Sequence, residues 1–354
     1  MRYTVTCRSS VALVTYVYSR KMNDTNSIKY KILIAHKEIP KRGLHVFEEK
    51  LKNRYELILS ETKGSPIPTR ETLLNDIRGV DAVLWYGHIR VDEEMIHAAG
   101  KQLKVVGSMG AGYDHLDVET LRKHNIKVSN TPNVLSCAVA DMAIGLALAV
   151  SRNILQGHNA ILGDKWIVNH PAWMCGPALE GCTVGIVGLG AIGSKIARRI
   201  RTFDINKLLY NTRHQRPEAA DLGAKYVSLD QLLVESDFVF LTVPITPETK
   251  NLLNLDKFKK MKSTSIIVNV ARGEVINQDD LVTALQSKMI GGAGLDVMTP
   301  EPLPPDHPLT KLPNVVLSPH ISGATFRARE AMAVLAAENI CNALNDQELI
   351  TPIL

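Results

Sequence analysis

Three glycines and, further along the chain, an arginine, a glutamate and a histidine are the residues whose types and spacing could do chemistry. The pattern G-x-G-x-x-G stands at Gly188, Gly190 and Gly193, after an apolar run at 183–187 and at the start of a helically periodic segment, 192–202. Glycines in that context make a tight turn, let backbone amides approach a pyrophosphate and allow close helix packing. The pattern therefore predicts a site for NAD or NADP.

Arg272, Glu301 and His320 follow later apolar runs, where the ligand-facing loops of an open α/β sheet collect. An arginine offers two parallel hydrogen bonds to a carboxylate. A histidine can give a proton near neutral pH, and a neighbouring carboxylate orients the imidazole and favours its protonated form. The three predict reduction of a small 2-keto acid without a metal, although Arg272 alone could be a structural ion pair and Glu301 could face solvent.

The end of the second strand of the cofactor-binding region carries no carboxylate. About 20 residues beyond the glycines, an NAD site usually shows Asp or Glu for the ribose hydroxyls. This chain has Asn211, Thr212, Arg213 and Arg216 there instead. Two cations suit the 2′-phosphate of NADP, so we expect NADP(H) to be preferred over NAD(H). The alternative is that both arginines are simply exposed loop residues.

The composition is that of a soluble globular protein of two domains, with 354 residues, 45% hydrophobic and 22% charged. Of the formal net charge of +5, four charges come from Arg2, Arg8, Arg20 and Lys21, which precede the first acidic residue. The body is near neutral, so we expect no surface for nucleic acid or an anionic membrane. The long apolar stretch 134–150 is too short to span a bilayer and contains an aspartate.

The five cysteines show neither C-x-x-C spacing nor paired spacing near histidines, which argues against a disulfide framework or a zinc site. A reducing, cytoplasmic location fits this pattern best. Residues 1–28 are poor in acids and include an apolar stretch, so a mitochondrial presequence or a weak signal peptide is the alternative. A disordered extension is the simpler interpretation, because no cleavage pattern follows.

Two series of β-rich runs that alternate with amphipathic segments predict an α/β protein of two lobes. The first lobe, a flavodoxin-like substrate domain, is expected to comprise residues 29–130 and 326–354, with an Ala-rich helix at 325–344 packed onto it. Its strand candidates are 32–35, 57–59, 82–85, 105–107 and 127–129, and its helix candidates include 69–77, 93–99 and 118–124.

The second lobe, residues 131–325, is expected to be a doubly wound, Rossmann-type cofactor domain. Its strand candidates are 183–187, 207–210, 225–227, 238–243, 265–269, 292–295 and 315–317. Ser228 and Asn277 are expected helix N-caps, and Asn133 is expected to cap a buried or interface helix over 134–150. Residues 151–182 look like an extended connection. The active site should lie in the cleft between the lobes.

Five motifs stand in order along the chain: G-L-G-A-I-G at 188–193, N-V-A-R-G-E at 269–274, G-L-D-V at 294–297, P-E-P-L-P at 300–304 and S-P-H-I-S-G-A-T at 318–325. With them the chain resembles the D-isomer-specific 2-hydroxyacid dehydrogenases over residues 30–354, and within that family the glyoxylate and hydroxypyruvate reductases of animals. The resemblance implies NADPH-dependent reduction of hydroxypyruvate to D-glycerate and of glyoxylate to glycolate. S-G at 322–323 departs from the expected G-S, a swap that affects rate more than reaction type.

The resemblance also implies roles for individual residues. Arg272 would bind the substrate, His320 would be the acid/base and Glu301 its partner, with the backbone of 108–112 helping to hold the carboxylate. The residues implied to contact the cofactor are Gly188, Gly190, Ala191, Ile192, Gly193, Asn211, Thr212, Arg213, Arg216, Val243, Pro244, Val270, Asp296 and Gly323. Those implied to contact the substrate are Gly87, Met109, Gly110, Trp173 and Arg272.

By similarity, residues 134–182 would build a homodimer interface. Trp173, in the sequence W-M-C-G, would then border the substrate pocket of its own subunit or of the partner subunit. Plain interface packing is the alternative, because tryptophan is common at interfaces.

Other functions stay open beside the reductase. Many phosphoglycerate dehydrogenases carry an additional C-terminal domain, whereas 34 residues follow His320 here. Formate dehydrogenases pair the histidine with glutamine, but position 301 is Glu. A nucleotide-sensing corepressor like the C-terminal-binding proteins would share the fold and the catalytic trio, although Arg213 and Arg216 favour the reductase.

Overall fold

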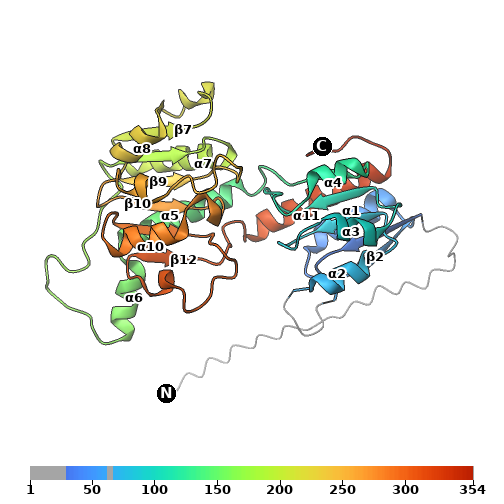
Figure 1. The fold of residues 1–354 in the computed structure, drawn as a ribbon, viewed down its shortest axis with the longest axis horizontal. Coiled ribbons are helices and arrows are strands. Elements are labelled where there is room, and N and C mark those ends of the chain that lie inside the picture. Colours follow the sequence, from blue (N-terminus) through green and yellow to red (C-terminus); the bar gives the residue numbers. More distant parts are fainter. Residues whose placement is uncertain (1–28, 62–66, 354) are drawn as a thin grey trace, which may run out of the picture.

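The computed structural model describes residues 29–61 and 67–353, so the expectations for residues 1–28 lie outside the described residues. The chain forms two lobes, each built on a parallel sheet with helices on its faces (Figure 1). This is the predicted α/β architecture.

The first lobe contains a five-stranded sheet in the order β2-β1-β3-β4-β5, which is the predicted flavodoxin-like order. All its pairings are parallel. Its strands are β1 (Tyr30–Ile34), β2 (Tyr55–Leu59), β3 (Ala82–Trp85), β4 (Val105–Ser108) and β5 (Lys127–Ser129), and its helices are α1 (Lys41–Leu51), α2 (Arg70–Asp76), α3 (Glu93–Ala99) and α4 (Val118–Lys123). Thr69, Asp92 and Asp117 cap α2, α3 and α4, because each side chain accepts a hydrogen bond from an amide three residues on.

The second lobe contains a seven-stranded parallel sheet in the order β12-β11-β10-β9-β6-β7-β8. Its strands are β6 (Thr183–Val187), β7 (Lys207–Asn211), β8 (Ala224–Tyr226), β9 (Phe238–Leu241), β10 (Ile266–Asn269), β11 (Gly292–Leu295) and β12 (Val315–Leu317). The chain passes from β8 back to β9 on the other side of β6, so the sheet is doubly wound. Ligands of such sheets bind at that reversal, beyond the carboxyl ends of the strands.

The helices of the second lobe are α5 (Ser136–Ser151), α6 (Ile154–Leu162), α7 (Ala191–Ile200), α8 (Leu229–Glu235), α9 (Leu255–Phe258) and α10 (Gln278–Gln286), with 3-10 turns at Arg201–Phe203, Pro217–Ala219, Gly273–Val275 and Pro308–Lys311. Ser228 and Asn277 cap α8 and α10 as predicted. The predicted cap at Asn133 is wrong: Leu135 precedes α5, and Asn133 adopts a left-handed conformation with φ 69°. The expected extended connection over 151–182 is also wrong in its first part, which forms α6.

Helix α5 is largely buried between the second sheet and α7, as predicted for an apolar helix of this length. Within residues 29–61 and 67–353 no single helix is long and apolar enough to cross a membrane, although α5 and α6 pass that test together, with a bend of 58° between them.

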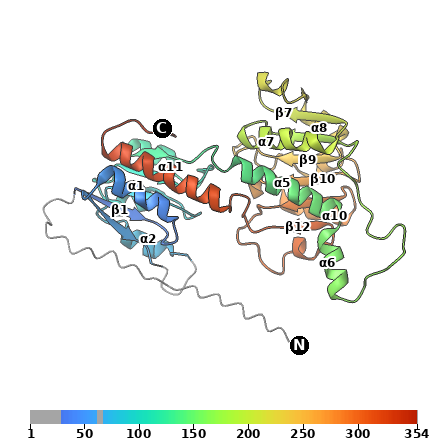
Figure 2. The ribbon, with the colours of Figure 1, turned by 180° about the vertical axis from the view of Figure 1, so that it is seen from behind.

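The last helix, α11 (Phe326–Leu344), returns to the first lobe and lies along α1, as Figure 2 shows from behind. A side chain at Gly43 would collide with Ala333, so the two helix backbones are in close contact. The hydroxyl of Tyr30 donates a hydrogen bond to the carbonyl of Leu344 at 2.5 Å. The first and last segments of the described chain therefore share one core.

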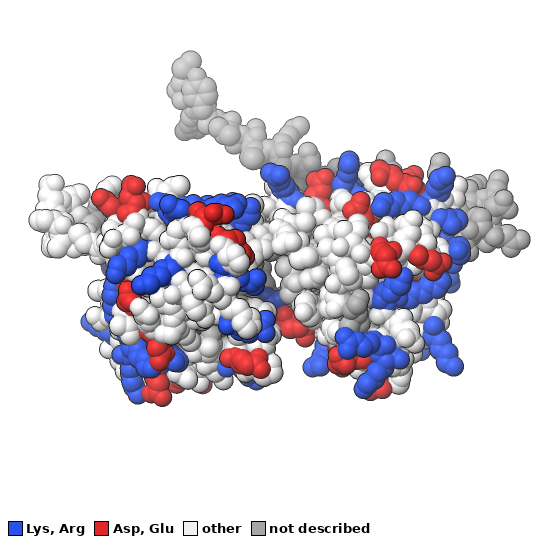
Figure 3. Space-filling view, turned by 90° about the horizontal axis from the view of Figure 1, so that it is seen from above, with Lys and Arg blue, Asp and Glu red and all other residues white. Residues whose placement is uncertain are grey.

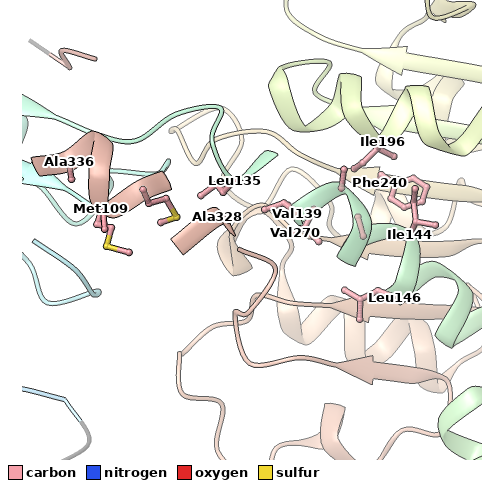
Figure 4. Packing of buried hydrophobic residues seen from close by; sticks show 14 of the residues in the cluster. Met109, Leu135, Val139, Ile144, Leu146, Ile196, Phe240, Val270, Ala328 and Ala336 are labelled. Carbon is pink, nitrogen blue, oxygen red and sulfur yellow. The ribbon is translucent and has the colours of Figure 1, made fainter. Parts of the chain in front are cut away.

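One hydrophobic cluster continues from one lobe into the other. Figure 4 shows Met109 and Ala336 in the first lobe, Leu135 and Ala328 at the junction, and residues such as Phe240 in the second lobe. Apolar packing at the junction positions the lobes, and the surface is indented between them (Figure 3). On the face in that view, cationic and anionic side chains are interspersed.

Candidate active site

The glycine turn lies at the reversal of the second sheet, between β6 and β9. Gly188 has φ 98°, a conformation that glycine adopts without strain, and a side chain there would come within 3.0 Å of Thr242 and Val243 after β9. A side chain at Gly193 would overlap the carbonyl oxygen of Gly188. Gly188 therefore makes the turn, and Gly193 lets α7 approach the turn closely. These are the structural roles that the sequence predicted for the two glycines.

Gly190 has a different environment, because a side chain there would meet no atom within 4 Å. It is exposed and directly precedes α7. The backbone amides of Ala191, Ile192 and Gly193 have no acceptor among the described residues. An open glycine beside unpaired amides at a helix start fits the pyrophosphate of a dinucleotide.

The four residues expected near the adenosine follow or end β7. Asn211 and Thr212 are half-buried and bonded within the lobe: the Asn211 amide donates to the Val227 carbonyl at 2.8 Å, and the Thr212 hydroxyl to that of His214 at 2.6 Å. Arg213 and Arg216 are exposed, and neither forms an ion pair within the part of the chain that the structure describes. Their guanidinium groups are thus available to an anion.

The other residues expected at the cofactor lie at the same edge of the sheet, and the loops after β9, β10 and β12 carry them. Val243 touches the glycine turn, Pro244 is exposed beside it, and Val270 is buried at the end of β10. Gly323 lies near Leu135 at the lobe junction. Their contacts with a nucleotide remain predictions.

His320 and Glu301 form the closest polar pair of the site. His320 Nδ1 lies 2.7 Å from Glu301 Oε2, and Glu301 Oε1 accepts a hydrogen bond from the Met298 amide at 3.0 Å. Burial opposes ionisation of Glu301, but the hydrogen bond from His320 outweighs it and holds the pKa of this carboxyl below its ordinary value. Because the ionised carboxylate can only accept, His320 carries its proton on Nδ1 and turns Nε2 outward.

Asp296 positions the loop that carries His320. Its buried carboxylate accepts hydrogen bonds from the Ser318 hydroxyl at 2.5 Å, from the amides of Ile321 and Ser322 at 2.9 Å each, and from the Ser322 hydroxyl. The His320 amide donates to the Asp296 carbonyl at 2.8 Å, and His320 itself has φ 53°. The structure shows that Asp296 holds this loop, and its expected position near the nicotinamide stays a prediction. The order Ser-Gly at 322–323 lets that serine contribute.

Arg272 reaches from the second lobe to the first. Its Nε and Nη2 each lie 2.9 Å from Asp114 Oδ1, and its Nη1 donates to the Ala271 carbonyl at 2.8 Å. Burial works against ionisation of Asp114, but the hydrogen bond from Arg272 lowers the pKa of the carboxyl. Arg272 therefore forms the structural ion pair that the sequence left open as an alternative to substrate binding. This ion pair with Asp114 joins the two lobes.

The loop after β4 lies against Arg272. A side chain at Gly112 would overlap the guanidinium, so the two are in close contact. Among the described residues, the amides of Gly110, Ala111 and Gly112 donate no hydrogen bond. Met109 is a poorer candidate than expected, because it is 4% exposed and its amide already donates to the Trp85 carbonyl at 2.8 Å. Residues 110–112 and Arg272 therefore form the concentration of donors that a carboxylate requires.

Sequence reasoning missed His88, which follows Gly87 in the loop after β3. Its ring centroid lies 5.0 Å from that of His320, across the junction of the lobes. His88, Glu301 and His320 each offer a ligand atom within 4.8 Å of the others. The available signal was its position next to Gly87, which the resemblance had already singled out.

Trp173 is not brought to this site within the subunit. Its amide donates to the His170 carbonyl at 3.2 Å, and the next residue, Met174, accepts a bond from Asn153 at the start of α6. Figure 1 shows the long segment after α6 on the side of the second lobe that faces away from the first. Of the two positions expected for Trp173, a place beside His320 and Arg272 of its own subunit does not agree with these contacts.

A glycine turn at the reversal of a doubly wound sheet, with a histidine, a glutamate and an arginine on later loops of the same lobe, where it faces the other lobe, defines an NAD(P)-dependent oxidoreductase. Residues 144–322 match the model of the D-isomer specific 2-hydroxyacid dehydrogenase NAD binding domain. The chain belongs to the D-isomer specific 2-hydroxyacid dehydrogenase family.

Individual relatives cover most of the chain. A glyoxylate reductase/hydroxypyruvate reductase of Mus musculus is 43% identical over 285 residues, 80% of this chain and 87% of the relative. A glyoxylate reductase of Thermofilum pendens is 42% identical over 87% of this chain and 90% of its own length. The solved structure of an NADPH-dependent glyoxylate/hydroxypyruvate reductase from Sinorhizobium meliloti, in complex with NADP and malonate, is 33% identical with a TM-score of 0.76, covering 92% of this chain and 97% of that one.

Proposed function

We propose that the protein is an NADPH-dependent reductase of glyoxylate and hydroxypyruvate, giving glycolate and D-glycerate. The observation that carries the proposal is the His320–Glu301 pair at 2.7 Å, beside Arg272 and at the carboxyl edge of the sheet that bears the glycine turn. The names and complexes of the relatives support the substrate class.

In this mechanism a reduced nicotinamide supplies the hydride for the keto carbon. Arg272 and the free amides of residues 110–112 hold the substrate carboxylate. Protonated His320 donates from Nε2 to the keto oxygen and gives up that proton as the oxygen becomes a hydroxyl. Glu301 stabilises the imidazolium through Nδ1 and keeps the ring oriented. The residues need no metal for any of these steps.

Turnover of NADPH with each keto acid tests this proposal, using the purified protein and its His320→Asn variant. We expect both acids to be reduced, with losses of about 10²- to 10⁴-fold in kcat for the variant, because the proton donor is missing. Absence of turnover with both acids in the wild type, or full turnover in His320→Asn, would falsify the proposal.

The preference for NADPH rests on Arg213 and Arg216. Replacing both with Ala should raise KM for NADPH by roughly 10- to 100-fold, because charge-assisted bonds to a phosphate are lost, and leave KM for NADH nearly unchanged. Arg198→Ala, an exposed arginine further along α7, is the matched control. Equal effects on the two nucleotides would refute the assignment.

We propose that the exposed apolar surface of α6 and the segment after it forms the homodimer interface. Ile154, Leu162, Trp166 and Val168 are 54%, 73%, 64% and 70% exposed, and an apolar surface of this kind marks an association site. Trp173 lies in the same region and would approach the pocket of the partner subunit. Sedimentation should give a dimer for the wild type and a monomer for Leu162→Asp; a monomeric wild type would contradict the proposal.

A further inference from the structure

His88 is presented to the site by a loop with little freedom. The loop leaves β3 through Gly87, whose φ of 119° favours glycine. The indole of the buried Trp85 donates to the Ile89 carbonyl at 3.2 Å and so ties the loop down on the other side of His88. The imidazole then lies over His320, with the two rings at 43° to each other.

The polar atoms of this imidazole have no partner in residues 29–61 and 67–353. Glu301 and Asp296 are bonded at both oxygens, His320 is bonded at Nδ1, and Arg272 is bonded along the edge that faces Asp114. Among these groups, His88 alone keeps both a donor and an acceptor without an intramolecular bond, and one of its ring nitrogens lies within 4.8 Å of a ring nitrogen of His320.

The surroundings of His88 favour its neutral form. Burial is the main cause that lowers its pKa, and repulsion by His320 adds to it. A neutral imidazole holds an anion poorly, but it can both donate to and accept from a hydroxyl.

Two of the three substituents of the keto carbon already have partners in the site, so His88 is left to contact the third. The carboxylate is matched by Arg272 with the amides of residues 110–112, and the keto oxygen by His320. The third substituent is a hydrogen in glyoxylate and a hydroxymethyl group in hydroxypyruvate. A substrate whose oxygen lies about 3 Å from His320 Nε2 is within reach of an imidazole centred 5.0 Å from the His320 ring.

We propose that His88 is a specificity-determining residue that hydrogen-bonds the C3 hydroxyl of a 3-hydroxy-2-keto acid. The inference rests on the proposed function and deepens it, because it makes the first lobe responsible for the choice among keto acids. A site that bonds a substrate hydroxyl disfavours the analogue that lacks it, since its own polar group is then left unpaired.

The test measures kcat/KM with hydroxypyruvate, glyoxylate and pyruvate for the wild type, His88→Phe and His88→Gln. In His88→Phe the efficiency with hydroxypyruvate should fall by about 10- to 100-fold, while that with glyoxylate or pyruvate changes by less than about threefold. His88→Gln, which retains a donor and an acceptor, should recover a large part of the loss. His45→Phe, at an exposed position on α1, is the matched control and should leave kcat/KM unchanged for all three keto acids.

The outcomes separate the inference from the function beneath it. Equal losses with all three acids would place His88 at the carboxylate or in proton transfer and overturn the inference, as would an unchanged hydroxypyruvate-to-pyruvate ratio in His88→Phe. Either result would refute the role of His88 without contradicting the proposed reductase function. If the wild type reduces no keto acid, both the reductase function and the role of His88 are refuted.

Discussion

The nucleotide-binding turn and the loops that face the substrate are held in place by different kinds of interaction. Around Gly188 and Gly193 the contacts are steric and local: the turn closes on the residues after β9, within a single sheet. On the substrate side, the loops of the first lobe meet Arg272 and His320 of the second through the Asp114 ion pair and the contact of two imidazoles. One side is fixed by packing, and the other by charge and by the position of the lobes.

The largest effect should come from breaking the packed side at Gly193. Gly193→Ala places a methyl group on the Gly188 carbonyl, so we expect a lower melting temperature and a loss of NADPH affinity of more than about 100-fold. Gly190→Ala is the paired variant, because its methyl group meets no protein atom within 4 Å. Gly190→Ala should therefore have the melting temperature of the wild type and show only a loss of NADPH affinity. Calorimetry with nucleotide titration would check both, and equal melting temperatures for the two variants would contradict the comparison.

The sequence predicted the features that depend on local contacts better than those that depend on contacts between the two lobes. The glycine turn, the strand runs and the caps at Ser228 and Asn277 depend on neighbours close in sequence, and these predictions were confirmed. The pairing of Glu301 with His320 was also anticipated, because family motifs carry both residues.

What escaped the sequence depends on contacts between distant segments. Asp114 pairs with Arg272 across 158 positions, and His88 faces His320 only because the lobes pack as they do. No periodicity or spacing marks either residue. The cap at Asn133 failed for a local reason: this residue takes a left-handed conformation before α5, so its side chain has no helix amide to accept from.

A moderate effect should come from the cross-lobe ion pair. Asp114→Ala removes the carboxylate that aligns the Arg272 guanidinium, so KM for the keto acid should rise by about 10-fold while KM for NADPH stays within about twofold. Asp114→Asn keeps an oxygen acceptor and should give a smaller rise. Steady-state kinetics with both substrates measures this, with Asp221→Ala, an exposed position on the second lobe, as control. A fall in KM in Asp114→Ala would mean instead that the carboxylate competes with the substrate.

The smallest effect should be a loss of stability with acid, arising in the loop that follows β4. Burial lowers the pKa of His115 to about 4, from an ordinary value of 6.5, and its Nε2 lies 3.2 Å from the Ser108 hydroxyl. Between those two values the unfolded chain binds a proton that the folded protein does not, so stability falls as pH falls through this window. From pH 6.5 to 5.5 the loss should be about 1 kcal/mol, or a shift of roughly 2 °C. His115→Gln should flatten that part of the melting profile between pH 7.5 and 5.5. If the wild type and this variant show the same slope, the acid sensitivity arises elsewhere, and the substrate-facing loop is held more firmly than its charges indicate.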